Sequence, residues 1–180
     1  PTALSVAREY LAGASVGDYA LFAGGYAGGS ASNVVDAYNT SLTRSTPTAL
    51  SAARFSLAGA SVGAYALFAG GAIGGAVVDA YNTSLTRSTP TALSVARNNL
   101  AGASVGAYAL FAGGYAGGRS NVVDAYNTSL TRSTPTALSV AREYLAGASV
   151  GAYALFAGGT GVSVFNEVDA YNTSLTRSTP

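Results

Sequence analysis

The chain contains no cysteine and no histidine. Without thiols it can form no disulfide, and without thiolates or imidazoles it lacks the ligands that zinc and copper prefer. We therefore expect no zinc or copper centre and no cofactor. Lysine is also absent, and nine arginines and eight acidic residues give a formal net charge of +1. This balance lacks the positive excess of nucleic-acid-binding proteins, so we expect no nucleic-acid partner.

Charged residues and long apolar runs are also scarce. Charged residues make up 9% of the 180 residues and hydrophobic residues 49%, whereas soluble domains usually have about 25% charged residues. A surface made mainly of Ser, Thr, Asn and backbone repels other copies only weakly, which favours association. Polar or glycine residues interrupt every apolar window, so we expect no membrane span. The first residues have neither the basic stretch nor the apolar core of a signal peptide, and the sequence indicates no cellular location.

The phrase Pro-Thr-Ala-Leu-Ser divides the chain into tandem repeats. Its prolines, together with the final proline, are spaced by 46, 43, 45 and 45 residues. Near-identity at this period is typical of solenoids, propellers and other repeat arrays. We expect a single repeat domain, 1–180, built of units 1–46, 47–89, 90–134 and 135–179.

Each unit contains the stretch Tyr-Ala-Leu-Phe-Ala-Gly-Gly. An apolar run that stops at a glycine pair predicts one buried strand per unit. A run of small residues precedes it, separated by the two residues of a tight hairpin turn. A third and a fourth strand follow after a glycine-rich connection of changing length. The strands expected in the first unit are 11–16, 19–23, 34–38 and 42–46, with turns at Gly17-Asp18 and Asn39-Thr40.

A helix at the start of each unit is the alternative. Leu4, Ala7, Leu11 and Ala14 fall at helical spacing, which would make each unit a helix plus a hairpin, as in a solenoid. The frequent Ser, Thr, Val and Gly in this segment argue against a helix. The first strand is small, the second apolar on both faces and the fourth polar, which suits a blade that is thin at an axis. The expected fold is therefore all-β, a β-propeller of four-stranded antiparallel blades with four blades per chain.

The units resemble kelch repeats, which build β-propellers. The kelch pattern runs an apolar stretch into a glycine pair, then a tyrosine, then a tryptophan, with an arginine opening the next unit. This chain has no tryptophan, and small polar residues stand at that place. The resemblance implies a binding platform; the copper-enzyme relatives need Cys and His. The matching residues are Gly24-Gly25, Gly70-Gly71, Gly113-Gly114 and Gly158-Gly159, the tyrosines Tyr38, Tyr81, Tyr126 and Tyr171, and the arginines Arg8, Arg54, Arg97 and Arg142.

Four units leave the closure of such a ring open. Propellers have from four to eight blades, so one chain could close a four-bladed ring or two chains an eight-bladed one. An open end would expose an apolar blade face. Our hypothesis is that a homodimer completes the ring.

One aspartate per unit lies within the third expected strand. Side chains alternate along a strand, so Val34, Asp36 and Tyr38 share one face. A carboxylate between two blades needs a partner. We predict that one arginine of each unit pairs with it, or that Ser, Thr and backbone N–H groups cap it, in a structural role. The four aspartates are Asp36, Asp79, Asp124 and Asp169.

The remaining acids show no catalytic pattern. Glycoside hydrolysis needs two carboxylates at a set separation, whereas Asp18, Glu9, Glu143 and Glu167 have no companion in a recognisable motif. We expect solvated loop charges and no enzyme. Residues 24–29 are rich in glycine but lack the lysine and the helix of a phosphate loop, so we expect a flexible connection there.

The units differ mainly in two places. These are the loop after the glycine pair and the two positions after the arginine. In an up-and-down blade both lie at the same end, so the variation predicts a binding face for a protein or a glycan. The alternative is a self-assembling structural array with no ligand, of natural or engineered origin. The candidate binding residues are Glu9, Tyr10, Tyr26, Phe55, Asn98, Tyr115, Arg119, Glu143, Tyr144 and Phe165.

Overall fold

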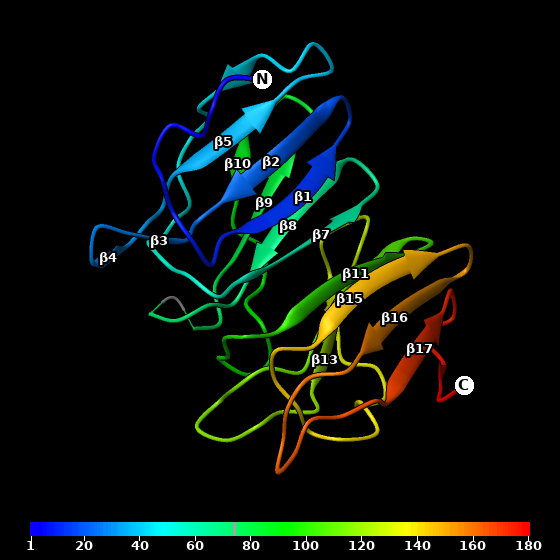
Figure 1. Ribbon diagram of the computed structural model, residues 1–180. Helices are drawn as coiled ribbons and strands as arrows, with labels where there is room; N and C mark the ends of the chain where they lie inside the picture. The colour runs from blue at the N-terminus through cyan, green and yellow to red at the C-terminus, as the bar shows by residue number, and fades with distance from the viewer. Residues whose placement is uncertain (74) are drawn as a thin grey trace.

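A computed structural model describes residues 1–73 and 75–180, and within them every regular element is a strand. Four antiparallel sheets of four strands each follow one another along the chain, one per repeat (Figure 1). The expected all-β class and the four-stranded unit are confirmed, and the helical alternative is wrong. Sheet 1 consists of β1 (Ala12–Val16), β2 (Tyr19–Ala23), β5 (Val35–Tyr38) and β6 (Arg44–Ser45).

The other three sheets repeat this order. Sheet 2 consists of β7 (Ala58–Val62), β8 (Tyr65–Ala69), β9 (Val78–Asn82) and β10 (Arg87–Ser88). Sheet 3 consists of β11 (Ala101–Val105), β12 (Tyr108–Ala112), β13 (Val123–Asn127) and β14 (Arg132–Ser133). Sheet 4 consists of β15 (Ala146–Val150), β16 (Tyr153–Ala157), β17 (Val168–Asn172) and β18 (Arg177–Ser178).

The outermost strand of each sheet is shorter than expected. In sheet 1 the amide oxygen of Asn39 accepts hydrogen bonds from the backbone N–H groups of Ser41 and Thr43. Leu42 adopts a positive φ of 57°. The turn therefore extends well beyond Asn39-Thr40, and only Arg44–Ser45 remain to pair with β5.

The glycine-rich connection of the first unit is a small hairpin rather than an irregular loop. Its two strands, β3 (Tyr26–Ala27) and β4 (Ser30–Ala31), pair with each other. The Tyr26 hydroxyl donates to the Gly29 carbonyl oxygen at 2.8 Å, which fastens the turn. The expectation of a flexible connection at 24–29 missed this pairing, because the composition of the segment is dominated by glycine.

The sheets stack face to face in chain order. Their first strands lie next to one another in the order β1, β7, β11, β15, and the N-terminal and C-terminal sheets lie at opposite ends of the row (Figure 1). Alternating side chains give each sheet a Leu face, which in sheet 1 is Leu21, Ala23, Val35 and Ala37. The opposite side is the Phe face, which in sheet 1 is Ala20, Phe22 and Tyr38.

Every interior contact joins the Leu face of one sheet to the Phe face of the next. Between sheets 1 and 2, the buried Leu face of sheet 1 packs against Ala66, Phe68 and Tyr81. The same positions recur in the two other apolar layers. Phe68 and Tyr81 contact each other edge to face, with ring centroids 6.1 Å apart. One packing solution is thus used three times.

The first strands approach closely because each has a glycine at its second position. A Cβ added to Gly59 would overlap the carbonyl oxygen of Gly13, and Gly102 and Gly147 have the same relation to the preceding sheet. A serine ladder runs beside them. The Ser15 N–H donates to Ser61 Oγ at 3.2 Å, and that hydroxyl donates to the Ser15 carbonyl oxygen at 2.7 Å. Small residues here permit the contact of backbone on backbone.

A buried ion pair ties the connection before each sheet to that sheet. Asp124 is inaccessible to solvent and contacts Arg97 at 2.8 Å and Arg132 at 2.9 Å, and its Oδ1 also accepts the Ser94 N–H. The Arg–Asp pairing predicted for each unit is therefore present, and both arginines take part. The pairs with the first arginine are Arg8–Asp36 at 2.9 Å, Arg54–Asp79 at 2.7 Å, Arg97–Asp124 at 2.8 Å and Arg142–Asp169 at 2.9 Å.

Burial shifts the ionisation of several groups in these layers. It raises the pKa of Tyr81, Tyr126 and Tyr171 well above the ordinary value of 10.0. Each of these hydroxyls donates to a threonine carbonyl oxygen of its own unit. Burial also lowers the pKa of the Arg54 guanidinium, and the Asp79 carboxylate opposes that shift.

Candidate loop-face site

The two variable segments of each unit meet at one end of the sheets. Glu9 and Tyr26 pair through their backbones, with the Glu9 N–H donating at 3.1 Å and the Tyr26 N–H at 2.8 Å. Equivalent bridges join residues 55 and 72, 98 and 115, and 143 and 160. The variable residues therefore share one surface, which we call the loop face.

The arginine of each unit anchors this surface to the sheet below it. Arg97 Nη2 donates to the Phe111 carbonyl oxygen at 2.9 Å as well as to Asp124. Asn98 and Asn99 follow Arg97 directly in the chain. The buried, charge-paired Arg97 side chain therefore holds the backbone at the start of this variable segment in place. Charge-assisted hydrogen bonds of this kind restrict the backbone more than neutral ones do.

The second position after each arginine has a left-handed backbone. These residues are Tyr10, Ser56, Asn99 and Tyr144, with φ values of 55°, 55°, 54° and 56°. The N–H groups of Ser56, Asn99 and Tyr144 each donate to the carbonyl oxygen of the equivalent residue in the preceding sheet, at 2.9 to 3.0 Å. The four residues, one from each repeat, are thus linked by a row of hydrogen bonds that runs from sheet to sheet. This frame holds variable side chains in a fixed order.

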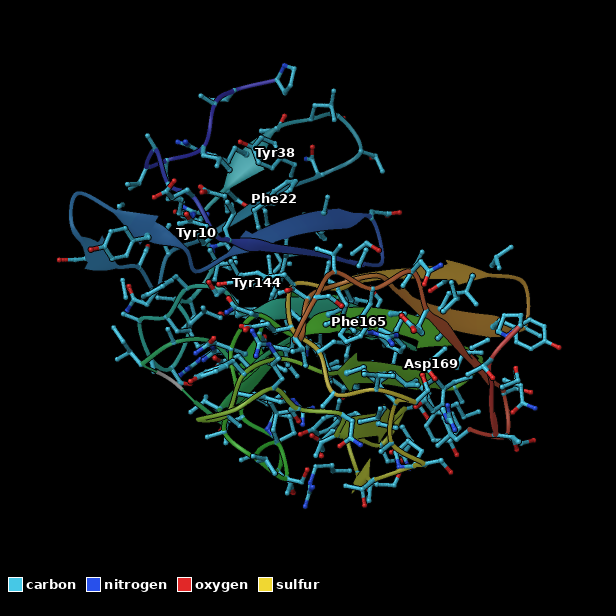
Figure 2. All side chains as sticks on the ribbon, turned by 60° about the horizontal axis from the view of Figure 1, so that its bottom comes forward. Tyr10, Phe22, Tyr38, Tyr144, Phe165 and Asp169 are labelled. Carbon is cyan, nitrogen blue, oxygen red and sulfur yellow. The ribbon has the colours of Figure 1, made fainter. Side chains whose placement is uncertain are left out.

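Side chains on this frame surround an open hollow of about 500 Å³. Tyr10 and Tyr144 both line it and are 59% and 67% exposed. The Tyr10 ring lies 6.4 Å from that of Phe55, and the Phe55 ring 5.1 Å from that of Tyr26. Figure 2 labels Tyr10 and Tyr144 on this side of the molecule. The other lining residues are Phe55, Ser56, Ala72, Asn98 and Asn99.

An adjoining hollow of about 260 Å³ has an apolar lining. Leu11, Leu57, Leu100 and Leu145 line it together with the four left-handed residues. The leucine of each unit comes directly after its left-handed residue, so its place follows from the repeat. The site therefore combines apolar surface, exposed phenol rings, and amide and hydroxyl groups.

Two neighbours hold the Glu143 carboxylate on the loop face. Glu143 Oε2 accepts a hydrogen bond from Asn99 Nδ2 at 3.1 Å, and its Oε1 lies 3.7 Å from Arg119 Nε. In the described ranges no group of three or more acidic residues could hold a metal ion. Nor does the described structure contain a helix long and apolar enough to cross a bilayer.

The structure brings together only part of the predicted binding set. Tyr10, Phe55, Asn98 and Tyr144 line the hollow. Phe165, labelled in Figure 2, lies in the loop after Gly159, where its N–H donates to the Gly159 carbonyl oxygen. It is not one of the residues that line the hollow. Ser56 and Asn99 were missed, although they occupy the same repeat position as Tyr10 and Tyr144.

Comparison with known sequences and family models assigns no function to the loop face. No protein-family model matches the chain, and no curated protein matches it.

Proposed function

We propose that this chain is a non-catalytic, kelch-like propeller scaffold that binds a glycan at its loop face. The observation that carries the proposal is the hollow bounded by Tyr10 and Tyr144 on a hydrogen-bonded frame. Its lining presents phenol rings to stack on the apolar face of a sugar ring, and amides to bond its hydroxyls. Pockets of this kind combine apolar area with a few placed polar groups.

The stacking of the sheets supports a propeller arc. In a propeller, four-stranded antiparallel sheets surround an axis with their first strands innermost. Here the first strands lie closest together and are made of Gly, Ala, Ser and Val, while the outermost strands carry arginine. The loop face would then surround one mouth of the axis.

A glycan is favoured over a protein segment because none of the residues that line the hollow is charged. A protein partner would be expected to use a wider surface with charged residues at its rim. The acidic group beside the hollow, Glu143, is held by Asn99 and Arg119, which argues against a free acid/base pair. The chemistry therefore fits recognition of a neutral sugar rather than its cleavage.

A glycan array followed by calorimetric titration tests the proposal. We expect the wild-type chain to give a specific signal with a neutral glycan and Tyr10→Ala and Tyr144→Ala to weaken it at least tenfold. Tyr115→Ala is the matched control, because Tyr115 is an exposed tyrosine of the same face that does not line the hollow. Absence of any glycan signal, or equal loss in all three variants, would reject the proposal. A signal on a protein array alone would favour the protein ligand instead.

A further inference from the structure

The two ends of the row of sheets are apolar and uncovered. Phe22, on the Phe face of sheet 1, is 37% exposed, whereas its equivalents Phe68, Phe111 and Phe156 are fully buried. At the other end, Val150 is 60% exposed, whereas its equivalent Val62 is 2% exposed. Figure 2 shows Phe22 and Tyr38 at one end of the molecule and Asp169 in the sheet at the other end.

The uncovered Phe face is hollowed. An open hollow of about 620 Å³ lies over it, lined by Leu4, Leu11, Phe22, Tyr38 and Leu42 among others. In the interior layers the equivalents of Leu4, Leu11, Phe22 and Tyr38 are buried, and those of Leu42 are partly buried. Leu50, Leu57 and Phe68 of sheet 2 and its connection, for example, are covered by the Leu face of sheet 1. The hollow is thus the space that a preceding Leu face would fill.

The uncovered Leu face belongs to sheet 4. All five residues of β15 are exposed, whereas β7 and β11 are buried at every second position. Its apolar side chains are those that cover a Phe face three times within the chain. The two ends of the molecule are therefore complementary to each other.

The backbone hydrogen bonds between sheets also indicate that the two ends are complementary. Between neighbouring sheets, Ser56 N–H donates to the Tyr10 carbonyl oxygen and Leu50 N–H to the Asn33 carbonyl oxygen. Within the described structure, the equivalent donors of the first unit, the N–H groups of Tyr10 and Leu4, have no such acceptor. The equivalent acceptors of the last unit, the carbonyl oxygens of Tyr144 and Asn166, have no such donor in the described part of the chain. Each missing bond needs a donor from one end and an acceptor from the other.

We propose that a second copy of this chain packs the Leu face of its sheet 4 on the Phe face of sheet 1, and that the reciprocal contact closes a ring of two chains. The occupant is a second copy because the covering surface must carry the residues already seen at three interior layers. It must also supply carbonyl oxygens in register with the free N–H groups of Tyr10 and Leu4. A contact of this head-to-tail kind forms a closed ring when its rotation closes.

Closure also completes the loop-face site. Tyr144 of the second copy would accept the N–H of Tyr10, which extends the row of left-handed residues into a ring. The proposal does not rest on glycan binding, since it depends on the end faces alone. If the chain did not dimerise, the open hollow of the loop face would still be present. If it bound no glycan, the two end faces would still be complementary.

Gly13 provides a sharp test of this contact. Within its own chain, a Cβ at Gly13 would make only ordinary van der Waals contacts, of which the nearest is with the Phe22 ring at 3.6 Å. In the proposed contact it would overlap the carbonyl oxygen of Gly147 in the second copy, as a Cβ at Gly59 would overlap that of Gly13. Gly13→Ala should therefore leave the fold intact and weaken association. Gly118→Ala is the matched control, because Gly118 has open space around it and is not among the glycines with positive φ.

The experiment is light scattering coupled to size-exclusion chromatography, over a dilution series. We expect the wild type and Gly118→Ala to give twice the single-chain mass of 17.7 kDa. Gly13→Ala should raise the dissociation constant of the dimer about tenfold or more, with an unchanged far-UV circular dichroism spectrum. A wild-type mass of one chain, a ladder of larger masses, or a dimer that Gly13→Ala does not weaken would overturn the proposal.

Discussion

Replacing the buried Asp124 by asparagine should destabilise the protein far more than the same exchange at an exposed aspartate. Asp124 is fully buried and contacts Arg97, Arg132 and the Ser94 N–H at 2.8, 2.9 and 3.0 Å. Asparagine removes the negative charge and turns an –NH₂ group toward these donors. Arg97, whose side chain is inaccessible to solvent, would keep its charge without a counter-ion.

Breaking a buried pair by removing one partner costs about 3–5 kcal/mol. That loss is a large part of the roughly 5–15 kcal/mol that stabilises a typical domain. Urea unfolding monitored by circular dichroism and by tyrosine fluorescence measures it, and coincidence of the two curves checks for partial unfolding of single repeats. Asp18→Asn is the matched control, since Asp18 lies on an exposed turn. If Asp124→Asn lost less than about 1 kcal/mol, the reasoning that the pair supports the fold would be refuted.

Two further predictions concern the apolar layers. Phe111→Ala should lower the unfolding free energy by about 3–5 kcal/mol. Phe22→Ala should lower it clearly less at concentrations where the chain is monomeric, because Phe111 is fully buried and Phe22 is not. Equal losses of unfolding free energy in urea titrations would contradict this packing. Raised folded-state pKa values of Tyr81, Tyr126 and Tyr171 contribute stability below about pH 10, which is lost as the pH rises through the folded values. Unfolding above pH 10 should therefore release up to three additional protons, seen as a steep loss of stability together with a cooperative rise in tyrosinate absorbance; three tyrosines titrating freely before unfolding would disprove it.

The strand pattern could be predicted from the sequence where side chains alone determine it. Strand β2 has the expected bounds, because its apolar run ends at a glycine pair that turns the chain with positive φ. The pairing of Asp36 with arginine could also be predicted, since a buried carboxylate requires a partner. Both inferences depend on local composition and on alternation along a strand.

Other features depend on contacts between sheets and could not be predicted from one unit. The left-handed backbone at Tyr10 gives no sequence signal, because tyrosine rarely adopts that conformation; it is maintained by hydrogen bonds to the neighbouring sheet. The role of Gly13, Gly59 and their equivalents likewise appears only when two first strands lie side by side. For the same reason Ser56 and Asn99 were missed at the loop face, although the repeat register places them beside Tyr10 and Tyr144.

In the proposed ring, sheet 4 of one chain packs on sheet 1 of another in the same way as sheet 1 packs on sheet 2 within one chain. The chain has no cysteine, so engineered thiols can test this contact without interference. Ser15 Oγ and Ser61 Oγ lie 3.5 Å apart, so the variant S15C/S61C should form a disulfide within one chain. The variant S15C/S149C should, on oxidation, give a covalent species of twice the 17.7 kDa chain mass on a non-reducing gel. If S15C/S149C stayed at the single-chain mass while S15C/S61C became oxidised, the account would be contradicted.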